Sequence, residues 1–182
     1  GSFVSERPLE KAVKIINELE PDLVLFTGDM VNNRTSEIEP FIETLRKIKA
    51  KKGVYSILGN HDYGDYVSWE TPQAKIDNLQ NLINTQRSMG WNVLLDENIT
   101  LEPNGEQISL IGIQNWGAKA RFPKYGDLKK AHTNSEKSPF KILMSHDPSH
   151  WREEVIALFQ DIDLTLSGHT HGFQFGVEIP GF

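Results

Sequence analysis

The sequence contains no cysteine, no surplus of basic residues and no long apolar run. Without cysteine, disulfides and thiolate-ligated metal sites are excluded. The 19 Lys and Arg residues against 25 Asp and Glu residues give a formal net charge of −6 at pH 7, which argues against a general nucleic-acid-binding surface. No apolar stretch approaches the roughly 20 residues that a transmembrane helix needs. A phosphate-bearing substrate remains compatible with this charge, because bound cations can reverse it locally.

The residues that are present indicate a layered α/β domain. A chain of 182 residues, 38% of them hydrophobic, is long enough for one domain with a sizeable core. Apolar residues at helical spacing predict helices over residues 5–20, 36–52, 76–89 and 151–159. Short apolar runs predict strands at 22–29, 54–62, 91–97, 99–103, 107–116, 140–147 and 162–171, with a hairpin turn at Asn104-Gly105. Strands that alternate with helices favour this architecture.

Four of the predicted strands end in polar motifs, which read "GD", "GNHD", "SHD" and "GHTH". In open α/β sheets, ligands bind outside the carboxyl ends of the strands, so residues that are distant in the chain become neighbours there. A single ending of this kind could be an ordinary turn, because Gly, Asn and Asp favour turns. Four such endings together favour a site. The candidate residues are Asp29, Asn60, His61, Asp62, His146, His169 and His171.

The candidate set offers imidazole nitrogen together with carboxylate and amide oxygen. This mixture suits Mn, Fe or Zn better than Ca or Mg, which prefer shells made of oxygen alone. Two such ions about 3.5–4 Å apart can clamp a phosphorus centre for in-line displacement, and a water that bridges them becomes a nucleophile near neutral pH. The composition of the set therefore favours phosphoester hydrolysis.

The ordered motifs "GDMVNN", "GNHD", "SHD" and "GHTH" resemble those of the calcineurin-like metallophosphoesterase superfamily. The stretches "GNHDYGDYVSW", "IGIQNWG", "SHDPSHW" and "LTLSGHTHGFQFG" resemble its membrane-attached bacterial phosphodiesterase branch. The resemblance covers almost the whole chain. It implies an α/β (α+β) fold, in which a four-layer sandwich of two mixed β-sheets is flanked by helices and carries a dinuclear metal centre at the strand ends.

The resemblance also implies roles for individual residues. Asp29 would bridge two divalent transition-metal ions (Mn, Fe or Zn), and Asn60, His146 and His169 would bind the second of them. The first ion would be bound by His171. His61 would lie beside the substrate phosphate, where it stabilises charge or protonates the leaving oxygen, and Asp62 would orient His61. The implied substrate is a phosphodiester or pyrophosphate, either a small molecule or lipid-linked, and no nucleic-acid partner is expected.

One departure from the family pattern limits these expectations. The first family motif, Asp-x-His at the end of a first strand, is absent from this chain. We therefore expect residues 1–182 to form a single phosphoesterase domain that is truncated at both ends, to bind at most one metal ion tightly and to be weakly active or inactive. The alternatives are a catalytically impaired binding or scaffold module of the same fold and, less favoured, a single-metal sensing domain. The branch resemblance implies membrane attachment through an N-terminal segment outside this chain.

The remaining candidates have structural interpretations that compete with functional ones. Tyr63, Asp65, Tyr66 and Trp69 follow "GNHD" and are interpreted as surface turn residues. His150 is interpreted as the start of a helix and His132 as a surface residue. Contact with substrate and a structural role both remain open for Asn32, Asn33, Asn115, Trp116, Arg121 and Lys124.

Overall fold

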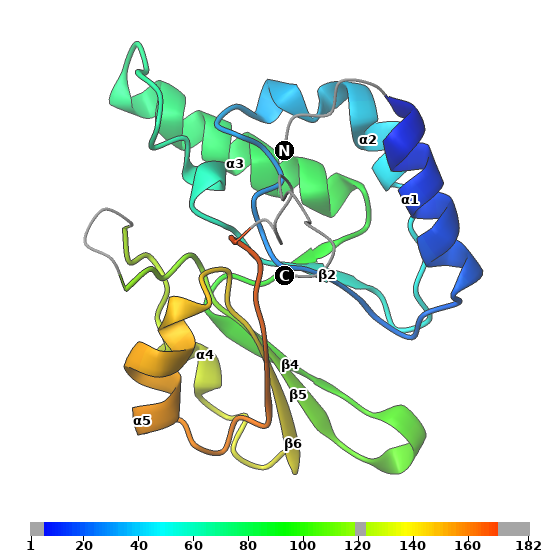
Figure 1. Ribbon diagram of the computed structural model, residues 1–182, viewed down its shortest axis with the longest axis vertical. Helices are drawn as coiled ribbons and strands as arrows, with labels where there is room; N and C mark the ends of the chain where they lie inside the picture. The colour runs from blue at the N-terminus through cyan, green and yellow to red at the C-terminus, as the bar shows by residue number, and fades with distance from the viewer. Residues whose placement is uncertain (1–5, 119–122, 171–182) are drawn as a thin grey trace, which may run out of the picture.

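The computed structural model describes residues 6–118 and 123–170, which form two β-sheets with helices on their outer faces (Figure 1). The first sheet has the order β1-β2-β3 and the second the order β4-β5-β6-β7. The strands are β1 (Val24–Phe26), β2 (Val54–Ser56), β3 (Asn92–Val93), β4 (Glu97–Leu101), β5 (Ile108–Gly112), β6 (Phe140–Met144) and β7 (Leu164–Leu166). The helices are α1 (Glu6–Glu18), α2 (Ile42–Leu45), α3 (Pro72–Ser88), α4 (Leu128–His132) and α5 (Ile156–Leu158). Shorter turns of helix are η1 (Thr35–Glu37), η2 (Glu39–Phe41), η3 (His61–Tyr63), η4 (Pro103–Gly105) and the π-helical η5 (Trp151–Val155).

The strand directions differ between the two sheets. The second sheet is mixed, because β4 pairs antiparallel with β5 while β5, β6 and β7 run parallel. The hairpin between β4 and β5 turns at η4, at the predicted position. The described part of the first sheet is wholly parallel, with β2 between β1 and β3. The described strands of the first sheet are parallel because each of their connections crosses over through helical segments.

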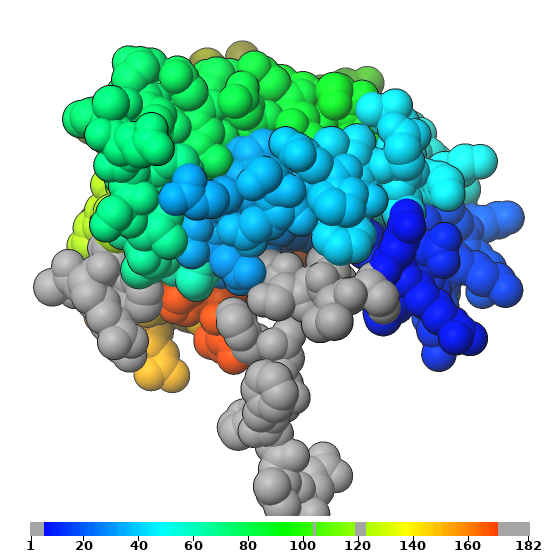
Figure 2. Space-filling view, turned by 90° about the horizontal axis from the view of Figure 1, so that it is seen from above, coloured from blue at the N-terminus to red at the C-terminus, as the bar shows by residue number. Residues whose placement is uncertain are grey.

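The alternation of side chains along the strands builds the four layers. Tyr55, Leu110 and Met144 belong to a core cluster between the two sheets. Their neighbours Val54 and Leu143 point the other way, because successive side chains in a strand face opposite sides. Val54 packs in the cluster that includes residues of α1 and α3, whereas Leu143 packs against residues of α4 and η5. In Figure 1, α1, α2 and α3 lie on one side of the first sheet, and Figure 2 shows the outer surface to which they contribute.

Most predicted helices form, but one is broken. Thr71 caps α3 by accepting a hydrogen bond from the backbone N–H of Ala74 at 3.1 Å, and the helix ends before Gly90, whose φ is +87°. The helix expected over residues 36–52 is instead divided into η1, η2 and the single turn α2. Pro40 lies in η2, where its missing N–H removes a helical hydrogen bond. α4 was not expected from the sequence.

β1 lies at the edge of the described sheet, where it pairs with β2 alone. All three residues of β1 are half-buried, whereas all three residues of β2 are buried. The domain limits of 1–182 stay a prediction. Across residues 6–118 and 123–170, no helix combines the length and apolar character needed to cross a bilayer.

Candidate metal centre

Four of the candidate side chains meet where the two sheets come together. Asp29 and Asn60 follow β1 and β2 of the first sheet, whereas His146 and His169 follow β6 and β7 of the second. Because β1 and β2 run parallel, as do β6 and β7, the strand ends of each pair lie at the same edge. The site therefore draws half of its side chains from each sheet.

Neighbouring ligand atoms of these residues lie between 2.9 and 3.3 Å apart. Asn60 Oδ1 lies 2.9 Å from His169 Nδ1 and 3.2 Å from His146 Nε2. His146 Nε2 lies 3.1 Å from Asp29 Oδ2 and 3.3 Å from His169 Nδ1. The ligand atoms of Asp29, His146 and His169 all lie within 4.8 Å of one another. One ion could reach all four side chains with small adjustments, because metal–nitrogen and metal–oxygen bonds are about 2.0–2.2 Å long.

The hydrogen bonds of His146 identify which of its nitrogens faces this cluster as an acceptor. Its Nδ1 lies 2.7 Å from the carbonyl oxygen of Thr27, which can only accept, so Nδ1 carries a proton. In the neutral ring, Nε2 then presents a lone pair toward Asn60 Oδ1 and Asp29 Oδ2, which are acceptors as well. Converging lone pairs without an intervening donor are unfavourable, and a cation among them relieves this repulsion. The chemistry of the donor set therefore fits a divalent transition metal.

The same convergence perturbs the ionisation of Asp29 and His146. Burial by itself raises the pKa of Asp29, but the hydrogen bonds and charges of His146 and His61 together outweigh it and hold that pKa below its usual value. Burial by itself lowers the pKa of His146, yet the hydrogen bond and charge of Asp29 raise it overall. A proton between the two side chains thus meets the same need for positive charge that a metal ion would meet.

Glycines, together with residues in the left-handed backbone conformation, allow the strand ends to approach one another closely. A Cβ atom on Gly59 would collide with the carboxylate of Asp29 and the ring of His146, and one on Gly168 would lie 2.9 Å from Thr27 Oγ1. Asp29 has a φ of +59° and His169 a φ of +65°. Such conformations are uncommon outside glycine and concentrate at functional sites.

Asp62 supports the backbone of the site. Its fully buried carboxylate accepts hydrogen bonds from four backbone N–H groups, which belong to Asp29, Met30, Val31 and Gly59. Burial raises the pKa of Asp62 to about 6, while the N–H donors act in the opposite direction. This carboxylate therefore ties the turn after β1 to the turn after β2.

His61 is oriented by the backbone of Asn32, and the expected role of Asp62 in orienting it is corrected accordingly. His61 Nδ1 lies 2.8 Å from the carbonyl oxygen of Asn32. The two oxygens of Asp62 are instead directed to backbone N–H groups. The backbone N–H of His61 donates to Asp29 Oδ1 at 3.0 Å. The ring of His61 is therefore held beside the ligand cluster by the backbone of Asn32 and not by Asp62.

Of the other candidates, two lie outside the described residues and two are more buried than the sequence indicated. His171 and Arg121 lie outside the described residues. Tyr63 is buried, with its ring stacked on Tyr125 at a centroid distance of 4.0 Å, and is not a surface turn residue. His150 precedes η5, as expected for a helix start, but it is fully buried.

One residue of the site was missed. Tyr66 was interpreted as part of a surface turn, yet its hydroxyl oxygen lies 2.8 Å from Asn60 Nδ2. Its ring also packs against that of His61, with centroids 4.8 Å apart. The sequence signal was an aromatic residue shortly after the motif "GNHD", just beyond Gly64, whose φ of +65° turns the chain back.

Comparison with known proteins identifies the relatives of this chain. Residues 5–173 match the family model described as calcineurin-like phosphoesterase. A zebrafish (Danio rerio) protein named transmembrane protein with metallophosphoesterase domain is 32% identical over 179 residues, which cover 96% of this chain and 38% of that protein. The UDP-2,3-diacylglucosamine pyrophosphatase LpxG of Chlamydia trachomatis is 27% identical, with 96% of this chain and 61% of that protein covered. The chain thus spans less than two thirds of the length of each of these relatives.

Solved structures support the fold. The NAD nucleotidase of Haemophilus influenzae matches 91% of this chain with a TM-score of 0.59 and 19% identity, and 32% of that protein is covered. The sulfate thiohydrolase SoxB of Thermus thermophilus matches 90% of this chain with a TM-score of 0.60 and 15% identity, and 34% of that protein is covered. At this level of identity the likeness concerns the fold alone.

Proposed function

The chain belongs to the calcineurin-like phosphoesterase family, and on that premise we propose that it is a metal-dependent phosphoester hydrolase of the phosphodiesterase or pyrophosphatase type. The observation that carries the proposal is the convergence of Asp29, Asn60, His146 and His169 on one point. These residues would hold a divalent Mn, Fe or Zn ion. When bound, the ion would supply a Lewis acid that polarises a phosphoryl oxygen and activates water.

We propose that His61 acts as a general acid that donates a proton to the leaving oxygen. The carbonyl of Asn32 accepts from Nδ1, which leaves Nε2 as the nitrogen that can exchange a proton with substrate. A positioned imidazole of this kind protonates the leaving oxygen in the transition state. Asp62 contributes by holding the backbone turns that carry Asp29 and His61.

The intact protein would hold two ions, with Asp29 as the bridging ligand and His171 bound to the first ion. For substrate, the name of the Chlamydia relative supports a lipid-linked pyrophosphate. The name of the zebrafish relative supports action at a membrane. These proposals concern the whole protein, because the chain spans only part of each relative.

The test combines metal content with turnover of an aryl phosphodiester. We expect the purified chain, loaded with Mn²⁺, to retain metal after gel filtration and to hydrolyse bis(4-nitrophenyl) phosphate slowly. His169→Ala removes one of four ligands and should abolish both properties. His132→Ala is the matched control, because His132 pairs with Asp161 away from the cluster, and it should behave as wild type.

Three results distinguish the possibilities. Loss of metal and turnover in His169→Ala alone supports the proposal. Retained metal without turnover in wild type would favour the catalytically impaired binding module instead. Equal metal content in wild type and His169→Ala would show that the ligand cluster is not the metal site.

A further inference from the structure

The side-chain amide of Asn60 has two chemically different ends in two different surroundings. Its carbonyl oxygen faces His146 Nε2 and His169 Nδ1, whereas its N–H group donates outward to the Tyr66 hydroxyl at 2.8 Å. Rotation of the amide by half a turn would exchange these ends and direct N–H groups into the cluster. An amide binds a cation through its oxygen and repels it through its N–H₂ group. The orientation of this amide therefore decides whether Asn60 can act as a ligand.

The partner of the N–H group is needed because Asn60 is 2% exposed. A buried N–H without an acceptor is costly, so it takes whichever acceptor is within reach. If the Tyr66 hydroxyl were removed, acceptors of the cluster would remain beside the amide: His146 Nε2 lies 3.2 Å from Asn60 Oδ1, and Asp29 Oδ2 lies 3.1 Å from His146 Nε2. The amide would then turn its N–H group inward.

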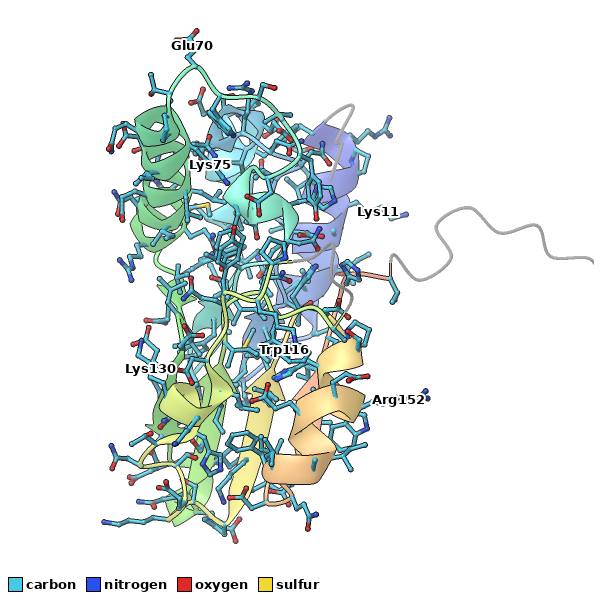
Figure 3. All side chains as sticks on the ribbon, turned by 90° about the vertical axis from the view of Figure 1, so that its left-hand side faces the viewer. Lys11, Glu70, Lys75, Trp116, Lys130 and Arg152 are labelled. Carbon is cyan, nitrogen blue, oxygen red and sulfur yellow. The ribbon has the colours of Figure 1, made fainter. Side chains whose placement is uncertain are left out.

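The loop that carries Tyr66 is fixed on several sides. Trp69 Nε1 donates to the carbonyl oxygen of Gly64 at 2.7 Å, and the Tyr125 hydroxyl donates to Asp65 Oδ2 at 3.0 Å. Lys75 of α3 pairs with Asp65 as well. Figure 3 shows Lys75 directed from α3 toward this loop, with Glu70 at its outer tip. The hydroxyl of Tyr66 is thus held inward although the residue as a whole is 45% exposed.

We propose that Tyr66 is a positioning residue, whose hydroxyl holds the Asn60 amide with its carbonyl oxygen toward the metal site. Its ring also packs against His61 at a centroid distance of 4.8 Å, so the same side chain supports the proposed ligand and the proposed acid. The inference rests on the proposed function, since it concerns the affinity of that site for a metal ion. Partners that orient metal ligands typically contribute 10–100-fold to metal affinity.

The experiment measures Mn²⁺ affinity by calorimetric titration, with no dependence on turnover. Tyr66→Phe keeps the ring on His61 and removes only the hydroxyl, and it should weaken binding about 10-fold. Asn60→Asp supplies two equivalent oxygens and no N–H group, so the orientation of the side chain no longer matters. Adding Tyr66→Phe to Asn60→Asp should therefore change affinity by less than about 2-fold, because the orienting contribution is gone. Tyr55→Phe is the matched control, since it removes a hydroxyl that donates to the carbonyl oxygen of Lys52, away from the Tyr66 loop, and its affinity should equal that of wild type.

The outcomes separate this inference from the function on which it rests. Equal Mn²⁺ affinity of Tyr66→Phe and wild type would overturn the inference and leave the proposed hydrolase untouched. An equally large loss in the Asn60→Asp background would also overturn it, because the hydroxyl would then act by a route other than the amide. If the wild-type chain bound no Mn²⁺, both the inference and the proposed function would be wrong.

Discussion

The imidazole of His61 and the backbone of His61 serve different parts of the site. The backbone N–H donates to Asp29 Oδ1 at 3.0 Å, whereas ring Nδ1 is held by the carbonyl of Asn32 at 2.8 Å. A substitution that removes the ring leaves the backbone hydrogen bond in place. The contribution of the ring to catalysis can therefore be separated from the support of the proposed ligand Asp29.

We expect His61→Ala to lower turnover of bis(4-nitrophenyl) phosphate on the order of 10²–10⁴-fold, which is typical of a lost acid–base group. Metal content should stay the same, because Asp29 keeps its backbone donor. Steady-state kinetics and metal analysis of the same preparation measure both quantities. Unchanged turnover with metal still bound would remove His61 from the mechanism.

At the scale of elements, the spacing of apolar residues predicted the strands and most helices, but it did not predict the contacts between elements. α1, α3 and the strands formed where apolar spacing placed them, because each buries an apolar face in a core cluster. The helix over 36–52 failed because Pro40 interrupts its hydrogen bonding. The strand-end motifs predicted that Asp29, Asn60, His146 and His169 would meet, whereas His171 lies outside the described residues. The bonds of Asp62 and Tyr66 depend on how one turn lies against another, and spacing along the chain does not encode that.

The burial of His150, at the start of η5, is a second feature that the spacing of apolar residues could not predict. The residue is fully buried, with Nδ1 2.9 Å from Ser145 Oγ and its ring 4.5 Å from that of Trp116. In Figure 3, Trp116 lies in the interior beside this helical segment. Burial lowers the pKa of His150 to about 4, because a charged imidazolium is poorly solvated there. η5 therefore packs against a neutral histidine.

This pKa predicts a loss of stability in acid. An unfolded histidine has a pKa of about 6.5, so between that pH and about 4 the unfolded chain binds a proton that the folded chain does not bind. The stability associated with neutral His150 is complete above pH 6.5 and falls as the pH drops to about 4, by about 3 kcal/mol in total. Urea unfolding at several pH values, with chelator present, measures the effect.

The matched variant for this prediction is His150→Gln, which cannot titrate. The unfolding free energy of wild type minus that of His150→Gln should decrease as the pH falls from 6.5 to 4, because only the wild type has a histidine at this position. Taking the difference removes the contribution of other groups, such as Asp62, whose pKa is raised to about 6. A difference that stays constant across this range would contradict the prediction.

For the molecule as a whole, the candidate metal centre is one of the places where the two halves of the sandwich share polar contacts. Asp29 and Asn60 follow strands of the first sheet, and His146 and His169 follow strands of the second. The two sheets also share an apolar cluster that includes Ile57, Leu110 and Met144. An ion bound by side chains of both sheets would hold the sheets together, and unfolding would require its release.

The last prediction follows from this placement. A ligand that binds only the folded state adds about 2.7 kcal/mol to the unfolding free energy at 100 times its dissociation constant. For a chain of this length, that stabilisation corresponds to a rise in Tm of about 5–10 °C. We expect Mn²⁺ or Zn²⁺ to produce such a rise, chelator to reverse it and Mg²⁺ to produce little, because the site offers imidazole nitrogen. His169→Ala should lose the response, since an ion would then lack one of its two ligands from the second sheet, whereas His132→Ala should keep it. Calorimetric scans at fixed protein concentration decide the matter, and a rise of equal size in wild type and His169→Ala would show that the ion binds elsewhere.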